Sequence, residues 1–332
     1  GDVGADKNTA IGHLAMGTGT TTTAIQNTAV GYDALTDLTT GNRNCAFGMN
    51  ALMNVTSGQT EGNVGLGYAA GGTLQTGDGN VVIGARAADA ITHTNCDGTV
   101  AIGRSALGAL TSGAKNIAIG YDALGDCIEG DRNIAIGYEA MNAMLGETGE
   151  DNVGDDNVAM GTDAMGTVDA GTHSASRTDG NVAIGTNALL GGDFITSGEY
   201  LIGNVAIGYS ALDATGSNSQ TGTIAIGYNA LTALTSGAGN IAIGYQTGYA
   251  LVEGNYNTSV GTYALMSGQE DSKCTAIGYQ ALTAADVSNT GSAVDTFNTA
   301  VGYHAGASVS TGLYNTILGG NAADALTTGS SN

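Results

Sequence analysis

The stretch Asn116-Ile117-Ala118-Ile119-Gly120-Tyr121-Asp122-Ala123-Leu124 decides the fold, because it recurs along the whole chain. It returns almost unchanged at 133–141 and in shorter form at 240–245. In the looser form N-x-A-[I/V]-G-Y-x-A-L there are seventeen copies, with glycines at 12, 31, 48, 67, 84, 103, 120, 137, 161, 185, 208, 227, 244, 261, 278, 302 and 319. Such internal repetition is the signature of a repeat architecture.

Successive motif glycines are most often 17 residues apart, and some intervals contain 2, 6 or 7 additional residues. The additions enter after the Ala-Leu step and leave the motif itself intact. The longer ones are at 144–156, 168–179, 194–202 and 287–297. We expect a single repeat array over residues 1–332, since each unit of such an array contacts mainly its neighbours.

Each copy begins with a segment that has the two-residue period of a strand. Counted from the glycine as position 0, position −1 is always apolar, −3 is Val, Ile, Thr or Cys, and +1 is Tyr in nine copies. The other face has Asn at −4 in 14 copies and Ala at −2 in 13. Ala and Gly allow another backbone to approach closely. We therefore expect both faces to be buried, one inside the coil and the small face, with Ala118 and Gly120, against a partner protomer.

The segment after the glycine contains Ala and Leu at +3 and +4, and Thr-Gly or Ser-Gly pairs follow as turn signals. The sequence thus predicts an all-β solenoid or roll of about 17 coils, with the Ala-Leu step as a short helical turn or a second short strand. Stacking gives three structural columns: Asn116, Asn133 and Asn240; Gly120, Gly137 and Gly244; Tyr121, Tyr138 and Tyr245.

Composition excludes several classes of function. The net charge of −22 argues against a nucleic-acid ligand, because phosphate binding needs Lys and Arg. The chain has no apolar run of about 18 residues, so we expect no membrane insertion. Its four cysteines have neither metal-ligand spacing nor a disulfide pattern, which predicts buried or inert thiols. Its four histidines are scattered, and no catalytic residues are predicted.

The motif N-x-A-[I/V]-G-Y-x-A-L with its T-[ST]-G linkers resembles repeats of bacteriophage tail fibres and other virion fibres. Its N-x-A-I-G part is also similar to the head repeats of trimeric autotransporter adhesins, which form a parallel β-roll in a homotrimer. The resemblance covers essentially the whole chain, although adhesin repeats are shorter and lack the regular Tyr-x-Ala-Leu step. It implies a homotrimer, a virion or extracellular location, and no particular receptor.

An acidic cluster lies in the first long insertion and consists of Glu147, Glu150, Asp151, Asp155 and Asp156. Hard cations such as Ca²⁺ prefer several carboxylate and carbonyl oxygens, but no EF-hand or nonapeptide calcium pattern is present. Two interpretations remain open, a solvated acidic loop and a Ca²⁺ site. No other cofactor is expected.

Three consecutive long insertions should emerge on one edge of the solenoid, because they enter at the same place in successive coils. They contain His173, Arg177, Phe194 and Tyr200, aromatic and polar groups that suit contact with a sugar. The sequence predicts either receptor binding here, to a cell-surface glycan or protein, or neutral decoration.

The leading hypothesis is a structural fibre segment, as in a phage tail fibre that mediates host attachment, located in the virion. The first alternative is a bacterial surface adhesin or other extracellular filament. An ice-binding solenoid is the second, although Thr occupies −3 in only six copies. An enzyme acting on polysaccharide would need paired carboxylates in a groove, and no such pair stands out, so we expect no enzymatic activity.

Overall fold

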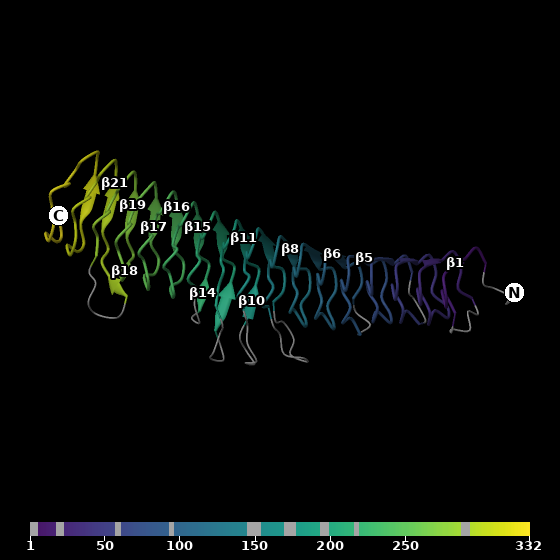
Figure 1. Cartoon of the computed structure of the whole chain (residues 1–332). Coiled ribbons are helices and arrows are strands. Elements are labelled where there is room, and N and C mark those ends of the chain that lie inside the picture. Colours follow the sequence, from purple (N-terminus) through teal and green to yellow (C-terminus); the bar gives the residue numbers. More distant parts are fainter. Residues whose placement is uncertain are drawn as a thin grey trace. The chain divides into compact units, whose positions relative to one another are not determined.

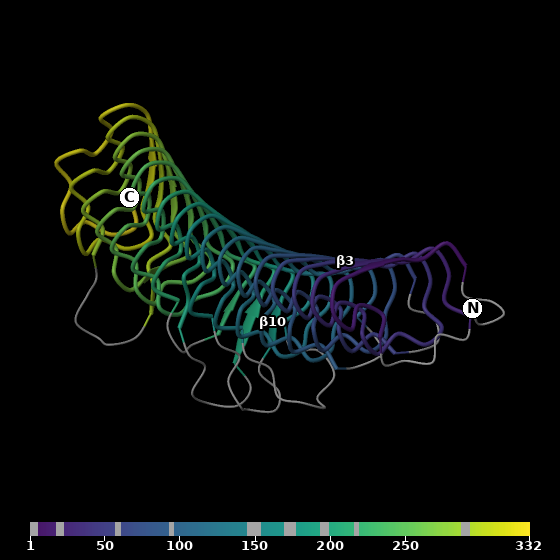
Figure 2. The ribbon, with the colours of Figure 1, turned by 45° about the vertical axis from the view of Figure 1, so that its right-hand side comes forward.

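The computed structural model describes residues 6–17, 23–56, 61–92, 96–144, 154–168, 177–192, 199–215, 219–286 and 293–332. By its internal contacts the chain divides into two compact units. The first comprises Gly1–Met160 with Ala170–Thr172, and the second comprises Gly161–Asp169 with His173–Asn332. Each unit is built of the same coil, and within each unit the coils stack side by side (Figures 1 and 2).

In the first unit every copy of the motif forms one three-residue strand, and neighbouring strands pair in parallel. These strands are β1 (Thr9–Ile11), β2 (Thr28–Val30), β3 (Cys45–Phe47), β4 (Val64–Leu66), β5 (Val81–Ile83), β6 (Val100–Ile102), β7 (Ile117–Ile119), β8 (Ile134–Ile136) and β9 (Val158–Met160).

The second unit continues the pattern with another run of parallel motif strands. These are β11 (Val182–Ile184), β13 (Val205–Ile207), β15 (Ile224–Ile226), β16 (Ile241–Ile243), β17 (Thr258–Val260), β19 (Thr275–Ile277), β21 (Thr299–Val301) and β22 (Thr316–Leu318). Together with β1 to β9 they give one strand for each copy of the motif. The prediction of an all-β solenoid is confirmed, and the parts of the chain that the structure describes contain no helix.

The pairing register aligns each motif with the next, so that Ala118 lies opposite Ala135 and Ile119 opposite Ile136. The glycine that ends each strand explains this close fit. At Gly120, φ is +144°, and a Cβ added there would lie 2.1 Å from the carbonyl oxygen of Gly137. The close backbone approach predicted for this position is therefore made by the next coil of the same chain.

The small strand face lies inside the coil, which corrects our expectation that it packs against another protomer. Ala118 at −2 is fully buried, as are Ala123 at +3, Leu124 at +4 and Cys127 at +7. The physical reason is the narrow interior, which the +4 and +7 side chains fill. At Gly65, another −2 position, even a methyl group would lie 2.7 Å from Cγ of Leu52. Branched −3 and −1 side chains therefore point outward.

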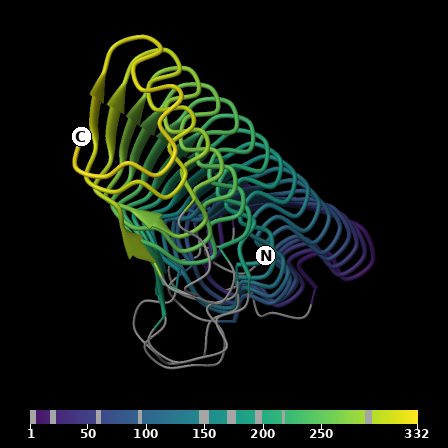
Figure 3. The same ribbon diagram turned by 90° about the vertical axis from the view of Figure 1, so that its left-hand side faces the viewer.

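The Ala-Leu step is a turn and not a helical segment. Leu124 has φ +51°, in the left-handed region, and its N–H donates to the carbonyl oxygen of Ala140 in the next coil at 2.9 Å. Where a leucine follows at +7, an i to i+3 bond closes the turn, as from the Leu38 N–H to the Leu35 carbonyl oxygen at 3.3 Å. Strands line one wall of the coil and turns make the rest (Figure 3).

Two small parallel sheets, both in the second unit, lie outside the motif. One joins β10 (Arg177–Asp179), β12 (Tyr200–Ile202) and β14 (Gln220–Thr221), and the other joins β18 (Asp271–Ser272) and β20 (Val294–Asp295). Strands β10, β12 and β20 begin where the insertions at 168–179, 194–202 and 287–297 return to the coil. The ends of the second and third insertions thus lie side by side, as the repeat spacing predicted.

Candidate functional site

The Asn column at −4 is a buried ladder with a structural role, interrupted by Thr99, Thr223 and Cys274. The side-chain oxygen of Asn116 accepts the backbone N–H of Asn133 at 2.9 Å, and Asn240 does the same for Asn257. Several side-chain amides also donate to a carbonyl later in the same coil, for Asn116 that of Gly130 at 2.7 Å. The predicted ladder is confirmed. Its bonds to main-chain groups join each coil to the next and also fix the bend of the chain within one coil.

The outer strand face, which we define as positions −3, −1 and +1 of every copy, is mostly apolar and is accessible in each unit. Ile11, Phe47 and Leu318 are 60%, 56% and 78% exposed. Most of the remaining −1 side chains are at least half-buried but still accessible. They point outward because the neighbouring residue at −2 points into the coil. Soluble monomers rarely expose contiguous apolar patches of this kind, and such patches mark interaction surfaces.

Tyrosines at +1 form the predicted aromatic column along this face. Tyr121 and Tyr138 stack with ring centroids 5.3 Å apart and an interplanar angle of 9°. In the second unit, Tyr209, Tyr228 and Tyr245 stack in the same way, with ring centroids 5.2 and 5.3 Å apart. Because each ring covers its neighbour's face, the column offers ring edges and hydroxyl groups to a partner.

Of the predicted receptor-binding residues, the structure brings Arg177 and Tyr200 together. They are register partners on β10 and β12, and both are exposed. The Arg177 guanidinium forms an ion pair with Asp179 at 2.6 Å on its own strand. His173 and Phe194 lie outside the described residues. Receptor binding at this edge stays a prediction.

The two described members of the predicted acidic cluster, Asp155 and Asp156, both form ion pairs with Arg132. Nε of Arg132 donates to Asp156 at 2.6 Å, and the guanidinium also contacts Asp155 at 3.0 Å and Asp131 at 3.3 Å. The hydrogen bond from Arg132 is the main cause that lowers the pKa of Asp156. Glu147, Glu150 and Asp151 lie outside the described residues, so the Ca²⁺ site stays a prediction. Within the described ranges, no group of three or more His, Cys, Asp and Glu could hold a metal.

Three of the four cysteines are buried, and Cys45 on β3 is exposed. Burial raises the pKa of the Cys96 thiol to about 11 and those of Cys127 and Cys274 to about 12. These three thiols are protonated at neutral pH and fill core or linker space. Cys45 occupies position −3 and is therefore part of the outer strand face.

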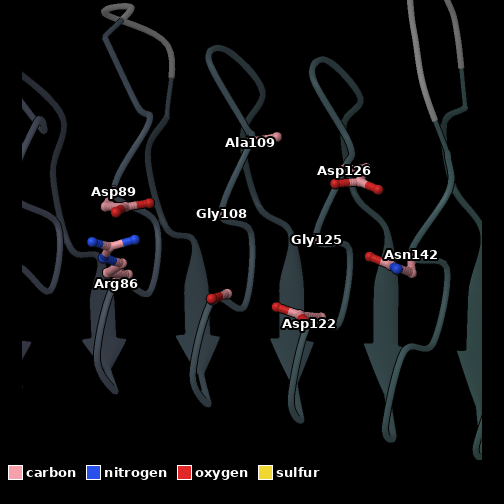
Figure 4. Close-up of a pocket in the computed structure, with 9 residues that line it drawn as sticks. Arg86, Asp89, Gly108, Ala109, Asp122, Gly125, Asp126 and Asn142 are labelled. Carbon is pink, nitrogen blue, oxygen red and sulfur yellow. The ribbon is translucent and has the colours of Figure 1, made fainter.

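A shallow polar groove of about 450 Å³ crosses four consecutive coils of the first unit (Figure 4). Its lining residues occupy the same turn positions in each coil: Arg86, Ser105 and Asp122 at +2, Asp89, Gly108, Gly125 and Asn142 at +5, and Ala109 and Asp126 at +6. Sequence reasoning missed this site. The signal that could have found it is the occurrence of Gly at +5 in two successive copies between Asp89 and Asn142.

Nothing in the described part of the chain has the length and hydropathy of a membrane-spanning helix. No family model, no curated protein and no solved structure matches the chain.

Proposed function

We propose that the chain is a structural fibre segment that assembles as a homotrimer through its outer strand face. The observation that carries this proposal is the recurrence of accessible branched and aromatic side chains in register on successive strands, Ile117, Ile119 and Tyr121 among them. Covering that face removes apolar surface from water at roughly 25 cal/mol per Å². A second copy presents the same columns at the same strand spacing, so every coil can contribute an equivalent contact.

The mechanism of such a segment is geometric. Ladder bonds and strand pairing hold each coil on the next, and the apolar face joins the protomers. The polar turns stay at the surface. In the fibre of a phage tail this arrangement carries host-attachment groups away from the particle, and in a bacterial adhesin it carries them away from the cell. The resemblance of the repeat supports a virion location and, as the alternative, an extracellular one.

Electron microscopy of the full chain tests the proposal. We expect particles containing several chains, and single-chain particles would contradict the proposal. Attachment is tested by binding of the fluorescent chain to candidate host cells, with the Arg177→Ala, Tyr200→Ala double variant compared with Lys115→Ala, a change at an exposed cation outside the outer strand face. We expect binding to fall only in the double variant, if the edge formed by β10 and β12 contacts the receptor.

One observation favours ice binding as a second candidate function. Four threonines, Thr258, Thr275, Thr299 and Thr316, are register partners on successive strands of the second unit and are accessible at position −3. Regular threonine rows on a flat β-solenoid face are suited to ordered water. Thermal hysteresis that disappears in Thr275→Leu would support ice binding, and its absence from the unaltered chain would exclude it.

A further inference from the structure

The groove of the first unit lies where two adjacent copies of the repeat both have glycine at position +5. Elsewhere position +5 often has a bulkier side chain, for example Thr36, Met53 or Leu190. Gly108 and Gly125 leave that place open in two adjacent coils and form the floor of the groove. At Gly125 the opening is needed, because an added Cβ would lie 2.4 Å from Oδ1 of Asn142.

The groove walls are polar and hold groups with complementary hydrogen-bonding capacities. Ionised carboxylates accept only, a guanidinium donates only, and hydroxyl and amide groups do both. Asp89, Asp122 and Asp126 supply acceptors, whereas Arg86 supplies donors and Asn142 supplies both (Figure 4). Burial raises the pKa of Asp89, with Arg86 opposing the shift. A carboxylate that has lost part of its hydration gains more from a ligand's hydroxyl or ammonium donor than a fully solvated one does.

The shape and charge of the groove narrow the class of ligand. No aromatic or large aliphatic side chain lines it, which argues against an apolar ligand. Three carboxylates face one guanidinium, which argues against phosphates, uronates and other anions. The lining side chains occupy the same turn positions in successive coils but differ in type, so a linear ligand with several hydroxyl groups can meet a polar partner in more than one coil.

We propose that this groove binds a short stretch of a polyhydroxylated sugar chain that is neutral or bears amino groups. Arg86 and Asn142 contact its oxygens, the carboxylates accept from its hydroxyl or ammonium groups, and the glycine floor admits the sugar ring. The site is separate from the outer strand face and from the edge formed by β10 and β12. Its failure would therefore leave the fibre proposal standing.

Calorimetric titration of the full chain with three hexasaccharides tests the proposal. The probes are a glucosamine hexamer, an N-acetylglucosamine hexamer and a hyaluronan hexamer with uronate groups. We expect binding of the glucosamine hexamer, weaker binding of the neutral one and none of the acidic one. Binding of neither the amino nor the neutral hexamer, or equal binding of all three, would overturn the proposal.

Two variants locate the binding in the groove. Ala109→Trp fills it and should weaken glucosamine-hexamer binding by about tenfold or more, the effect of losing one or two hydrogen bonds to charged groups. Its matched control is Ala250→Trp, at the same +6 position of another coil; both alanine N–H groups donate to the next coil at 2.9 Å. Asp126→Ala, at an exposed side chain, should weaken binding without affecting folding. Unaltered binding in both groove variants, with unaltered thermal melts, would contradict the assignment.

Discussion

The side-chain oxygen of Asn257 accepts the backbone N–H of Cys274 at 2.9 Å, and the Asn257 amide donates to the carbonyl oxygen of Asp271 at 2.7 Å. One buried side chain thus bonds to the next coil and also to a carbonyl group later in its own coil. This relationship recurs along each unit, and the stability of the fold depends on it.

Replacing Asn257 with alanine should lower the free energy of unfolding by about 3 kcal/mol. The change removes its bonds to Cys274 and Asp271 and leaves their main-chain groups buried without these partners. Urea denaturation followed by circular dichroism measures the effect. A change below about 0.5 kcal/mol, the usual range of surface substitutions, would contradict a structural role for the ladder.

Thr223 is one of the positions at which the ladder lacks Asn, and replacing it with Asn should stabilise the fold. Its N–H bonds to the Asn204 side chain at 2.9 Å, but its own hydroxyl is buried without a partner. Thr223→Asn supplies an acceptor toward Asn240 and an amide that can reach the carbonyl of Gly237, 14 residues on, as in other coils. We expect the free energy of unfolding to rise by about 1 kcal/mol, together with the melting temperature. A lower melting temperature would show that the extra hydrogen bonds do not form at this position.

Alanine substitutions at Gly120 and Gly79 distinguish the energetic cost of steric overlap from the cost of a positive φ angle. Both have positive φ, +144° and +67°, but a Cβ at Gly79 meets nothing within 4 Å. Gly79→Ala should therefore cost only about 1–2 kcal/mol, as expected for a left-handed residue. Gly120→Ala should prevent close stacking and cost well over that amount or block folding. Equal melting temperatures for the two variants would refute the stacking explanation.

The pair formed by Arg132 and Asp156 predicts a pH dependence of stability. The pKa of Asp156 is lowered in the folded state, chiefly by the hydrogen bond from Arg132. Its contribution is therefore present above the unfolded value of about 3.9 and is lost as pH falls through the lower folded value. The difference in melting temperature between the wild type and Arg132→Gln should shrink as pH is lowered from 6 toward about 2. A constant difference would indicate that Arg132 acts through packing alone.

The strand, its glycine and the Asn ladder could be predicted because each depends on a pattern within one repeat. Which side of the strand faces inward could not be predicted. A two-residue period defines two faces of a strand, but it does not say which face fits the narrow interior of the coil. Leu124 in a left-handed turn was missed as well, since leucine has no intrinsic preference for that conformation. The groove depends on Gly108, Gly125 and Asn142, which lie 17 residues apart and meet only when coils stack.

The central claim is that copies of the chain pack through the outer strand face. Sedimentation equilibrium of the wild type and of the Ile119→Lys, Ile136→Lys variant tests it most directly, with Asp126→Lys as a charge control on the turns. Both isoleucines lie on the accessible side of their strands, so the changes leave the coil interior intact. We expect three times the 32.6 kDa chain mass for the wild type and the control, and single chains for the double variant. A wild-type chain that sediments as a 32.6 kDa monomer would contradict the account.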